Sequence, residues 1–193
     1  MGEINFAQIA PRCGGQREAF EEICCQLARF SVPTDARFIR LRGDGGDGGV
    51  ECYADMSDGS RVGWQAKFVF NVDTFLVQVT ASLKTALAIH ARLTKYIVCF
   101  PFDLTGPTSR KCKSGIEKFD AWRAKWVRDA RKKGRQLVIE EWPESKLRTE
   151  LLRIDPHGGI RAFFFNSMVL SGTWFENHLS IATAAAGPRY TPS

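Results

Sequence analysis

The sequence lacks the long uncharged apolar run that a membrane span requires. No stretch of its 193 residues reaches the roughly 18 consecutive apolar residues of a transmembrane helix. The first five residues, Met1-Gly2-Glu3-Ile4-Asn5, contain neither the basic region nor the apolar core of a secretory signal peptide. We therefore expect a cytoplasmic chain with no membrane partner.

Several common catalytic and metal-binding motifs are also missing. The chain has six cysteines but no Cys-x-x-Cys pair, which argues against a zinc or dithiol redox motif and favours reduced thiols. It has no G-x-x-x-x-G-K-[ST] motif for nucleotide phosphates. His90, His157 and His178 share no motif, so they give no basis for a Ser-His or Cys-His hydrolase.

The composition is that of an ordinary globular protein. Apolar residues make up 44% and aromatic residues 11% of the chain, and this length is enough for one well-sized hydrophobic core. Intrinsic disorder is therefore excluded for most of the chain.

The net charge of +6 is concentrated in one segment. Residues 110–135 hold eleven Lys or Arg side chains against three carboxylates, so this segment carries +8 and the remainder −2. A basic run of this kind is typical of a surface that contacts a polyanion, although a solvated helix face is the alternative. Trp122 and Trp126 lie in the segment, and their spacing of four favours helix core anchors over base-stacking platforms. The cations that we expect at a nucleic acid are Lys111, Lys113, Arg123, Arg128, Arg131, Lys132 and Lys133.

Hydrophobic periodicity predicts an α/β fold. Apolar residues at helical spacing predict helices over 17–30, 73–92, 115–133, 144–153 and 173–186. Alternating or β-branched runs predict strands over 37–42, 50–56, 61–70, 96–100 and 136–140. Asp58-Gly59 predicts a hairpin turn, Asp73 is the expected cap of the second helix, and 160–166 fits an edge strand or a buried turn. This order indicates a central mixed β-sheet flanked by helices.

One predicted strand carries a lysine among apolar residues. In strand 61–70, Gln65 and Lys67 share one face because side chains alternate along a strand. Burial of an unpaired ammonium is costly, so Lys67 should reach either solvent or carboxylates. The preceding hairpin strand offers Glu51, and the glycine-rich loop before it offers Asp47.

These residue types suit a divalent cation and phosphodiester hydrolysis. Mg²⁺ takes oxygen ligands, here Asp47, Glu51 and the backbone carbonyl of Ala66, and Mn²⁺ is the alternative. The cation would neutralise a phosphate and lower the pKa of a water, while Lys67 holds that water or stabilises the developing charge. The pattern Gly43-x-Gly45-x-x-Gly48 formally matches a dinucleotide fingerprint, but it leads into a strand and carries carboxylates that would repel pyrophosphate.

The same residues resemble a known family. The stretches Gly43-Asp44-Gly45-Gly46-Asp47-Gly48-Gly49-Val50-Glu51 and Gly63-Trp64-Gln65-Ala66-Lys67 are similar to the acid loop and Gln-x-Lys signature of Mrr-like PD-(D/E)XK nucleases. The resemblance implies a restriction-endonuclease-like fold in which Glu51 is the main metal-binding acid, Asp47 the loop acid and Lys67 the catalytic lysine. Gln65 replaces the usual acidic residue, and Glu21 resembles the helix acid that some members add. Glu at 51 and Gln at 65 depart from the broad superfamily pattern.

A second resemblance covers most of the remainder. Residues 95–106, the Glu141-Trp142-Pro143 turn and residues 187–192 resemble the N-terminal nuclease domain of bacterial antiviral STAND NTPases, the AVAST defence proteins. This implies a nuclease domain over 1–186 and, over 187–193, the start of a linker to NTPase and sensor regions that the chain does not contain. It also implies activation by self-association.

We therefore expect a Mg²⁺-dependent endonuclease that cuts double-stranded DNA. Two alternatives stay open. A catalytically degenerate module on the same scaffold would bind nucleic acid without metal. A pure interaction domain would need no cluster of acids. The position of the basic segment relative to the acid loop distinguishes this alternative from the nuclease and from the degenerate module.

Overall fold

The computed structural model of the chain describes residues 4–12, 14–41, 48–107, 112–165 and 172–186. Its helical elements are η1 Phe6–Gln8, α1 Gln16–Ser31, α2 Val72–Ile89, α3 Gly115–Lys132, α4 Glu144–Ile154, α5 Gly159–Phe165 and α6 Gly172–Ala186. Its strands are β1 Arg37–Arg40, β2 Cys52–Asp55, β3 Arg61–Ala66, β4 Leu93–Cys99 and β5 Val138–Trp142.

The strands form one five-stranded sheet in the order β1-β2-β3-β4-β5. The first three strands are antiparallel to one another, whereas β3, β4 and β5 are parallel. The prediction of a mixed sheet flanked by helices is confirmed.

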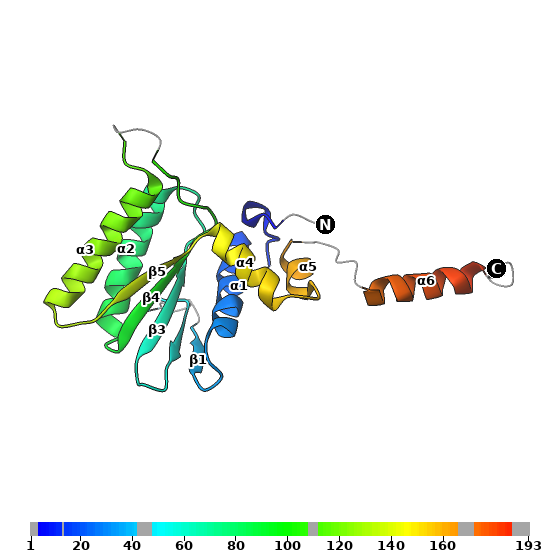
Figure 1. The fold of residues 1–193 in the computed structure, drawn as a ribbon, viewed down its shortest axis with the longest axis horizontal. Coiled ribbons are helices and arrows are strands. Elements are labelled where there is room, and N and C mark those ends of the chain that lie inside the picture. Colours follow the sequence, from blue (N-terminus) through cyan, green and yellow to red (C-terminus); the bar gives the residue numbers. More distant parts are fainter. Residues whose placement is uncertain (1–3, 13, 42–47, 108–111, 166–171, 187–193) are drawn as a thin grey trace.

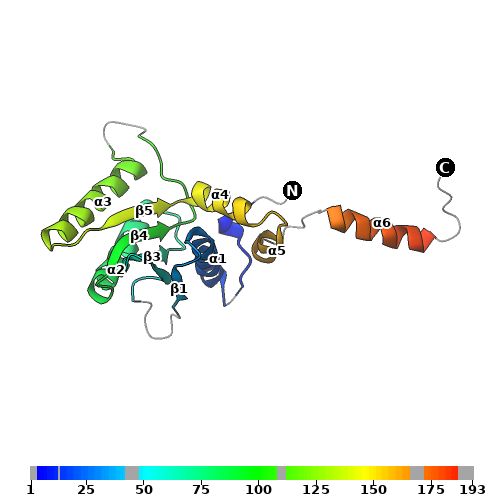
Figure 2. The ribbon, with the colours of Figure 1, turned by 60° about the horizontal axis from the view of Figure 1, so that its bottom comes forward.

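Helices cover both faces of this sheet. In Figures 1 and 2, α2 and α3 lie on one face and α1 with α4 on the other. The helices α2 and α3 are the crossovers between successive parallel strands. Because such crossovers share one hand, two that step in the same direction fall on the same face.

The interior strand β4 supplies side chains to two separate cores. Tyr96, Val98 and Phe100 pack toward α2 and α3, and Ile97 and Cys99 pack toward α1 and α4. A strand that is covered on both faces needs a continuous apolar run. This explains why the chain places apolar residues at every position from 96 to 100.

Four buried cysteines belong to the core on the α1 side, namely Cys24, Cys25, Cys52 and Cys99. All four are free thiols, in agreement with the prediction. Burial raises the pKa of the Cys24 and Cys52 thiols well above the ordinary value. Thiols of this kind are poor nucleophiles, so they act as small apolar side chains.

The predicted hairpin turn is confirmed. The backbone N–H of Gly59 donates to the Met56 carbonyl at 2.9 Å, and the Ser60 N–H donates to the Asp58 carboxylate at 2.8 Å. This turn joins β2 to β3, and it brings the residues that precede β2 beside those that end β3.

Three local predictions were wrong. The cap of α2 is Asn71, whose side chain accepts from the N–H groups of Asp73 and Thr74, because the helix begins one residue earlier than expected. Strand β3 ends at Ala66 rather than Phe70, since the Val69 N–H bonds to the Lys67 carbonyl at 3.0 Å and turns the chain. Residues 159–165 form helix α5, which buries Phe164 against the α1 side, instead of an edge strand or turn.

Helix α2 is the one described helix whose length and apolar composition would suffice to cross a membrane. In the fold it packs on the sheet beside α3, and it buries Phe75, Val79, Leu83 and Ala86.

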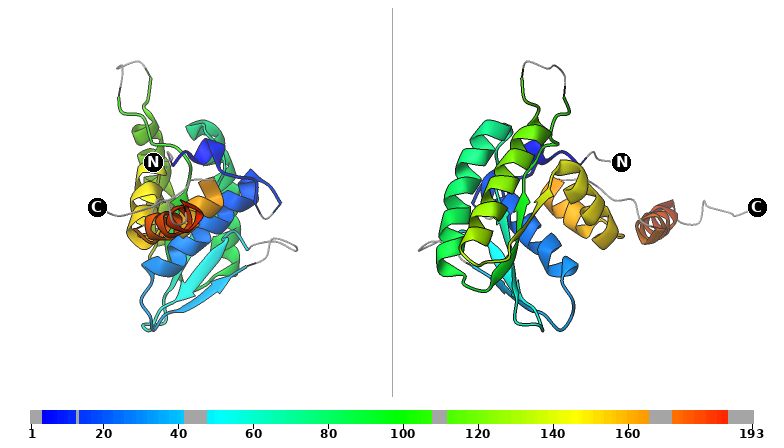
Figure 3. Two further views of the ribbon diagram at one scale, coloured as in Figure 1. Left: turned by 90° about the vertical axis from the view of Figure 1, so that its right-hand side faces the viewer. Right: turned by 60° about the vertical axis from the view of Figure 1, so that its left-hand side comes forward.

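Helix α6 lies apart from the layered body (Figure 3), and its described side chains are exposed. The prediction of a helix over 173–186 is therefore confirmed. The predicted linker, 187–193, lies outside the described residues.

The backbone before β2 passes very close to α2. Gly49 has a φ of +80°, a conformation that side chains with a Cβ disfavour. A Cβ built there would lie 2.1 Å from the Ser82 carbonyl oxygen and 2.6 Å from the Ala86 nitrogen. The Tyr96 hydroxyl donates to the Gly49 carbonyl at 2.9 Å and holds the segment in this place.

We predict that Gly49→Ala lowers the free energy of unfolding by about 3 kcal/mol or more, from backbone strain together with overpacking against α2. Gly59→Ala is the matched control, because Gly59 has a similar φ of +82° with no atom within 4 Å of the place where a Cβ would lie, and we expect a loss of about 1 kcal/mol. Urea denaturation of both variants measures the difference. Equal losses would show that the contact with α2 is unimportant.

Candidate functional site

Glu51 and Gln65 are neighbours on adjacent strands. The Glu51 N–H donates to the Trp64 carbonyl at 2.8 Å and extends the pairing of β2 with β3 by one residue. The Gln65 Nε2 donates to the Glu51 Oε1 in a short hydrogen bond. Two of the residues expected at the site are therefore in direct contact.

Gln65 is fully buried, with 0% of its surface exposed. Its Nε2 also donates to the Ala66 carbonyl at 3.2 Å, so that the amide, the carboxylate of Glu51 and this carbonyl lie together. Within the described residues, the Gln65 Oε1 has no hydrogen-bond partner. A buried polar oxygen without a partner costs about 1–3 kcal/mol, and native structures hold few such groups without a functional reason.

Lys67 lies one residue beyond the end of β3, not in the middle of the strand as predicted. Its N–H still donates to the Cys99 carbonyl at 2.9 Å, so β4 holds its backbone. The residue is half-buried and keeps contact with solvent. This arrangement removes the cost of a fully buried ammonium.

Glu21 lies in the first half of α1, which packs beside the end of β3. The ring of Phe20 lies 5.5 Å from the ring of Phe68. Arg17, one helical turn before Glu21, has its pKa raised by its hydrogen bond to Glu18, by the charge of Glu21 and more weakly by the charge of Glu51. The carboxylates of Glu21 and Glu51 thus act on the same guanidinium.

The loop acid cannot be placed in the same way, because Asp47 lies outside the described residues. The next residue, Gly48, is described, and a Cβ built on it would lie 3.0 Å from the His90 Nε2 at the end of α2. In the part of the chain that is described, no three His, Cys, Asp or Glu side chains come together as a metal-binding group.

The basic residues predicted at nucleic acid are spread along α3. This helix runs antiparallel to β3 and β4, so its start lies at the end of the sheet where Lys67 is, and its C-terminal turn lies at the opposite end (Figure 1). Its 18 residues span about 27 Å. Lys113, just before the helix, is therefore at the site's end of the sheet, and Lys111 lies outside the described residues.

The other five predicted cations differ in their surroundings. Arg123 is engaged by Asp120 and by Glu141, the latter at 2.8 Å. Four are exposed in the second half of α3 or just after it, far from Lys67: Arg128, Arg131, Lys132 and Lys133.

A polar cluster at the other end of β3 was missed by the sequence analysis. Arg61 donates to both carboxylate oxygens of Asp55, at 2.7 and 3.0 Å, and to the His90 Nδ1 at 2.9 Å. Its guanidinium lies 3.7 Å from the centre of the Tyr53 ring. Asp55, Tyr53 and Arg61 alternate normally along the hairpin, but nothing in the sequence indicates that His90, 29 residues later, closes the cluster.

His90 is 6% exposed, and burial, followed by the positive charge of Arg61, lowers its pKa. The folded state therefore favours the neutral imidazole. A histidine with a lowered pKa takes up its proton more readily in the unfolded chain, so stability falls as the pH drops through the ordinary histidine range near about 6.5.

We predict that the free energy of unfolding of the wild type is higher at pH 7.5 than at pH 5.5, and that His90→Asn reduces this difference. Denaturant unfolding at both pH values provides the measurement. His157→Asn is the control, since His157 is exposed and its replacement should leave the pH dependence unchanged. An unchanged pH dependence in His90→Asn would contradict the prediction.

Comparison with known proteins matched no family model, no curated protein and no solved structure. The residues of the chain and their geometry therefore carry the functional inference.

Proposed function

We propose that the chain is a Mg²⁺-dependent nuclease domain that hydrolyses phosphodiester bonds of double-stranded DNA. Its site comprises Asp47, Glu51, Gln65 and Lys67, with Glu21 nearby on α1. The observation that carries the proposal is the contact of the Gln65 amide with the Glu51 carboxylate beside the Ala66 carbonyl, directly before Lys67.

The fold is compatible with this function. A mixed five-stranded sheet with helices on both faces agrees with the restriction-endonuclease-like fold that the two motifs suggest. The β2–β3 hairpin and the turn after Ala66 then bring the described motif residues Glu51, Gln65 and Lys67 to one end of the sheet.

The described residues offer the oxygen ligands that a hard cation prefers, but they offer too few of them to hold it alone. Mg²⁺ prefers carboxylate and carbonyl oxygens and keeps several waters. Glu51 and the Ala66 carbonyl supply two such oxygens, and Gln65 holds a third with no partner among the described residues. Rotation of the Gln65 amide by half a turn would exchange its nitrogen and oxygen. The oxygen would then face Glu51, which is repulsive unless a cation lies between them. Asp47 is the further carboxylate that we assign to the cation.

When bound, the cation would neutralise the scissile phosphate and lower the pKa of the attacking water. Lys67 orients that water or the phosphate oxygen through its ammonium, which has solvent access at the end of β3. The water oxygen forms a bond to phosphorus as the bond to the leaving oxygen of the strand breaks. Glu21 and Arg17 lie at the border of the site, where Arg17 limits repulsion between the two glutamates.

Duplex DNA is the proposed substrate because of the basic surface. Lys113 is the described cation of the predicted set at the end of the sheet where Lys67 lies. Arg128 and Arg131 lie up to about one helix length away, so they would contact the backbone at a distance from the cut, whereas Lys132 and Lys133 line a pocket between α2 and α3. Such contacts increase affinity with little sequence preference.

A nuclease of low sequence specificity would be toxic if it were always active. This consideration, together with the resemblance to the effector domains of AVAST defence proteins, leads us to propose activation by self-association in a longer protein with NTPase and sensor regions.

One observation favours the second candidate, a degenerate module that binds nucleic acid without metal. No group of three metal-binding side chains is found among the described residues. In that case the Glu51–Gln65 bond would be purely structural, and binding would be insensitive to chelators.

Plasmid cleavage tests the first candidate. We predict Mg²⁺-dependent cutting by the wild type, at high concentration or as a fusion to an oligomerising partner, and no cutting in EDTA. Lys67→Ala should lower the rate by about 100-fold or more, because it removes the charge that stabilises the transition state.

Lys146→Ala is the control for that experiment, since Lys146 pairs with Glu150 on the outer surface of α4. This variant should cut at the wild-type rate. DNA binding without cutting by the oligomerised wild type would establish the degenerate module instead.

Metal binding can be tested without DNA. We predict that Mg²⁺ or Mn²⁺ raises the melting temperature of the wild type, because a ligand that binds only the folded state stabilises it, and that Glu51→Gln abolishes the rise. Glu140→Gln is the control, as Glu140 pairs with Lys95 at the surface of the sheet. A rise of equal size in Glu51→Gln would exclude Glu51 as a ligand.

A further inference from the structure

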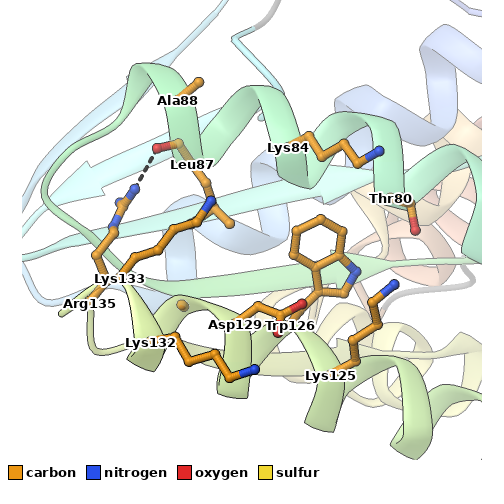
Figure 4. Close-up of a pocket in the computed structure, with 11 residues that line it drawn as sticks. Thr80, Lys84, Leu87, Ala88, Lys125, Trp126, Asp129, Lys132, Lys133 and Arg135 are labelled. Carbon is orange, nitrogen blue, oxygen red and sulfur yellow. Dashed lines mark hydrogen bonds between the residues drawn. The ribbon is translucent and has the colours of Figure 1, made fainter.

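A groove lies between α2 and α3, with a cavity volume of about 670 Å³. Volumes of about 300–1,000 Å³ are typical of small-molecule sites. Figure 4 shows side chains from both helices that converge on it. Glu51 and Gln65 do not line the groove. The contact of Gly49 with Ser82 and Ala86 is on a different side of α2, so the groove is separate from the candidate nuclease site.

The groove is strongly cationic. Lys84 projects from α2, Lys125 and Lys132 project from α3, and Lys133 follows the end of α3. Asp129 is the one carboxylate among the residues that line it. Four ammonium groups around one concave surface favour a ligand with several negative charges.

The floor of the groove is apolar and aromatic. The half-buried indole of Trp126 lies between Lys84 and Lys125 in Figure 4, with Leu87 and Ala88 further along α2. Indole faces stack on flat heteroaromatic rings and also attract cations. The neighbouring Trp122 is held by its bond from Nε1 to the Thr80 Oγ1 at 2.9 Å, which fixes the two helices together beside this floor.

Arg135 closes one end of the groove. Its guanidinium donates to the carbonyls of Leu87 and His90, the latter at 2.7 Å, and so caps the C-terminus of α2. These bonds fix the loop after α3 against α2, so the shape of the groove does not depend on a ligand. They also occupy the Arg135 charge, which leaves the lysines as the cations that face a ligand.

We propose that this groove binds a free nucleotide with several phosphates. The base stacks on Trp126, the lysines bind the phosphates, and Asp129 accepts hydrogen bonds from the base or the ribose. The lysines alone would suit any polyanion, but the indole and the carboxylate call for a ligand that also has a flat ring and hydrogen-bond donors.

A strand of nucleic acid fits these observations less well. A strand needs an open path with cations along its whole length, whereas this groove is closed at Arg135 and has a carboxylate among its lining residues. The groove volume also suits a single small ligand. The proposal does not rest on nuclease activity.

The experiment is a calorimetric and fluorescence titration of the whole chain with ATP in EDTA, which excludes metal binding at the nuclease site. We expect one ATP per chain and quenching of tryptophan fluorescence that is largely lost in Trp126→Phe. Lys84→Ala and Lys125→Ala, both at exposed positions, should each weaken binding by about three- to tenfold. Lys146→Ala on α4 should bind ATP as the wild type does.

Other results would overturn the proposal. Equal weakening in Lys146→Ala would show that only the net charge of the chain matters. Inorganic tripolyphosphate that binds as tightly as ATP would show that no base is recognised. A single-stranded oligonucleotide that displaces ATP and loses affinity in Lys84→Ala would make the groove a nucleic-acid surface. The absence of any ATP binding would exclude the site.

Discussion

The burial of β4 on both faces is the constraint on which the rest of the structure depends. A strand with apolar side chains on both sides must be covered by two layers, and its parallel neighbours must be reached by crossovers. The helices α2 and α3 are those crossovers, so they share one face, and α1 with α4 covers the other. The groove between α2 and α3 follows directly from this arrangement.

The candidate nuclease site lies at the junction of the antiparallel and parallel halves of the sheet. The antiparallel hairpin sets Glu51 beside Gln65, and the parallel strand β4 holds the backbone of Lys67 through the Cys99 carbonyl. The close approach of Gly49 to α2 fixes the segment that leads into Glu51. Each of these three polar residues is thus held by backbone contacts, which is the arrangement that a pre-organised site requires.

The cations of the basic segment do not lie on one surface, because α3 runs away from the candidate site. Lys113 lies at the end of the sheet where Lys67 is, whereas the second half of α3 lies beside α2. Arg123 is neutralised by Asp120 and Glu141, and Arg135 caps α2. The basic segment of this chain therefore does not form one binding surface. The direction of α3 separates its cations in space, and local ion pairs neutralise some of them.

Much of the fold was determined by the sequence alone, whereas other features were decided only by the tertiary structure. The helices α1, α2, α3, α4 and α6, the five strands and the Asp58-Gly59 turn follow from periodicity and turn chemistry, which are local properties. The convergence of Glu51 with the Gln-x-Lys segment also follows, because the Asp58-Gly59 turn makes the two segments partners in a hairpin. The end of β3 at Ala66 and the helical state of 159–165 instead depend on packing against neighbouring elements, which overrides local propensity. The complete burial of Gln65 depends on elements that pack over it from distant parts of the chain. The contact of Arg61 with His90 likewise joins two positions that are 29 residues apart. The α2–α3 groove likewise depends on the tertiary structure. The two helices are separated in the sequence by β4 and lie side by side only in the fold, and the cavity arises from the space between them.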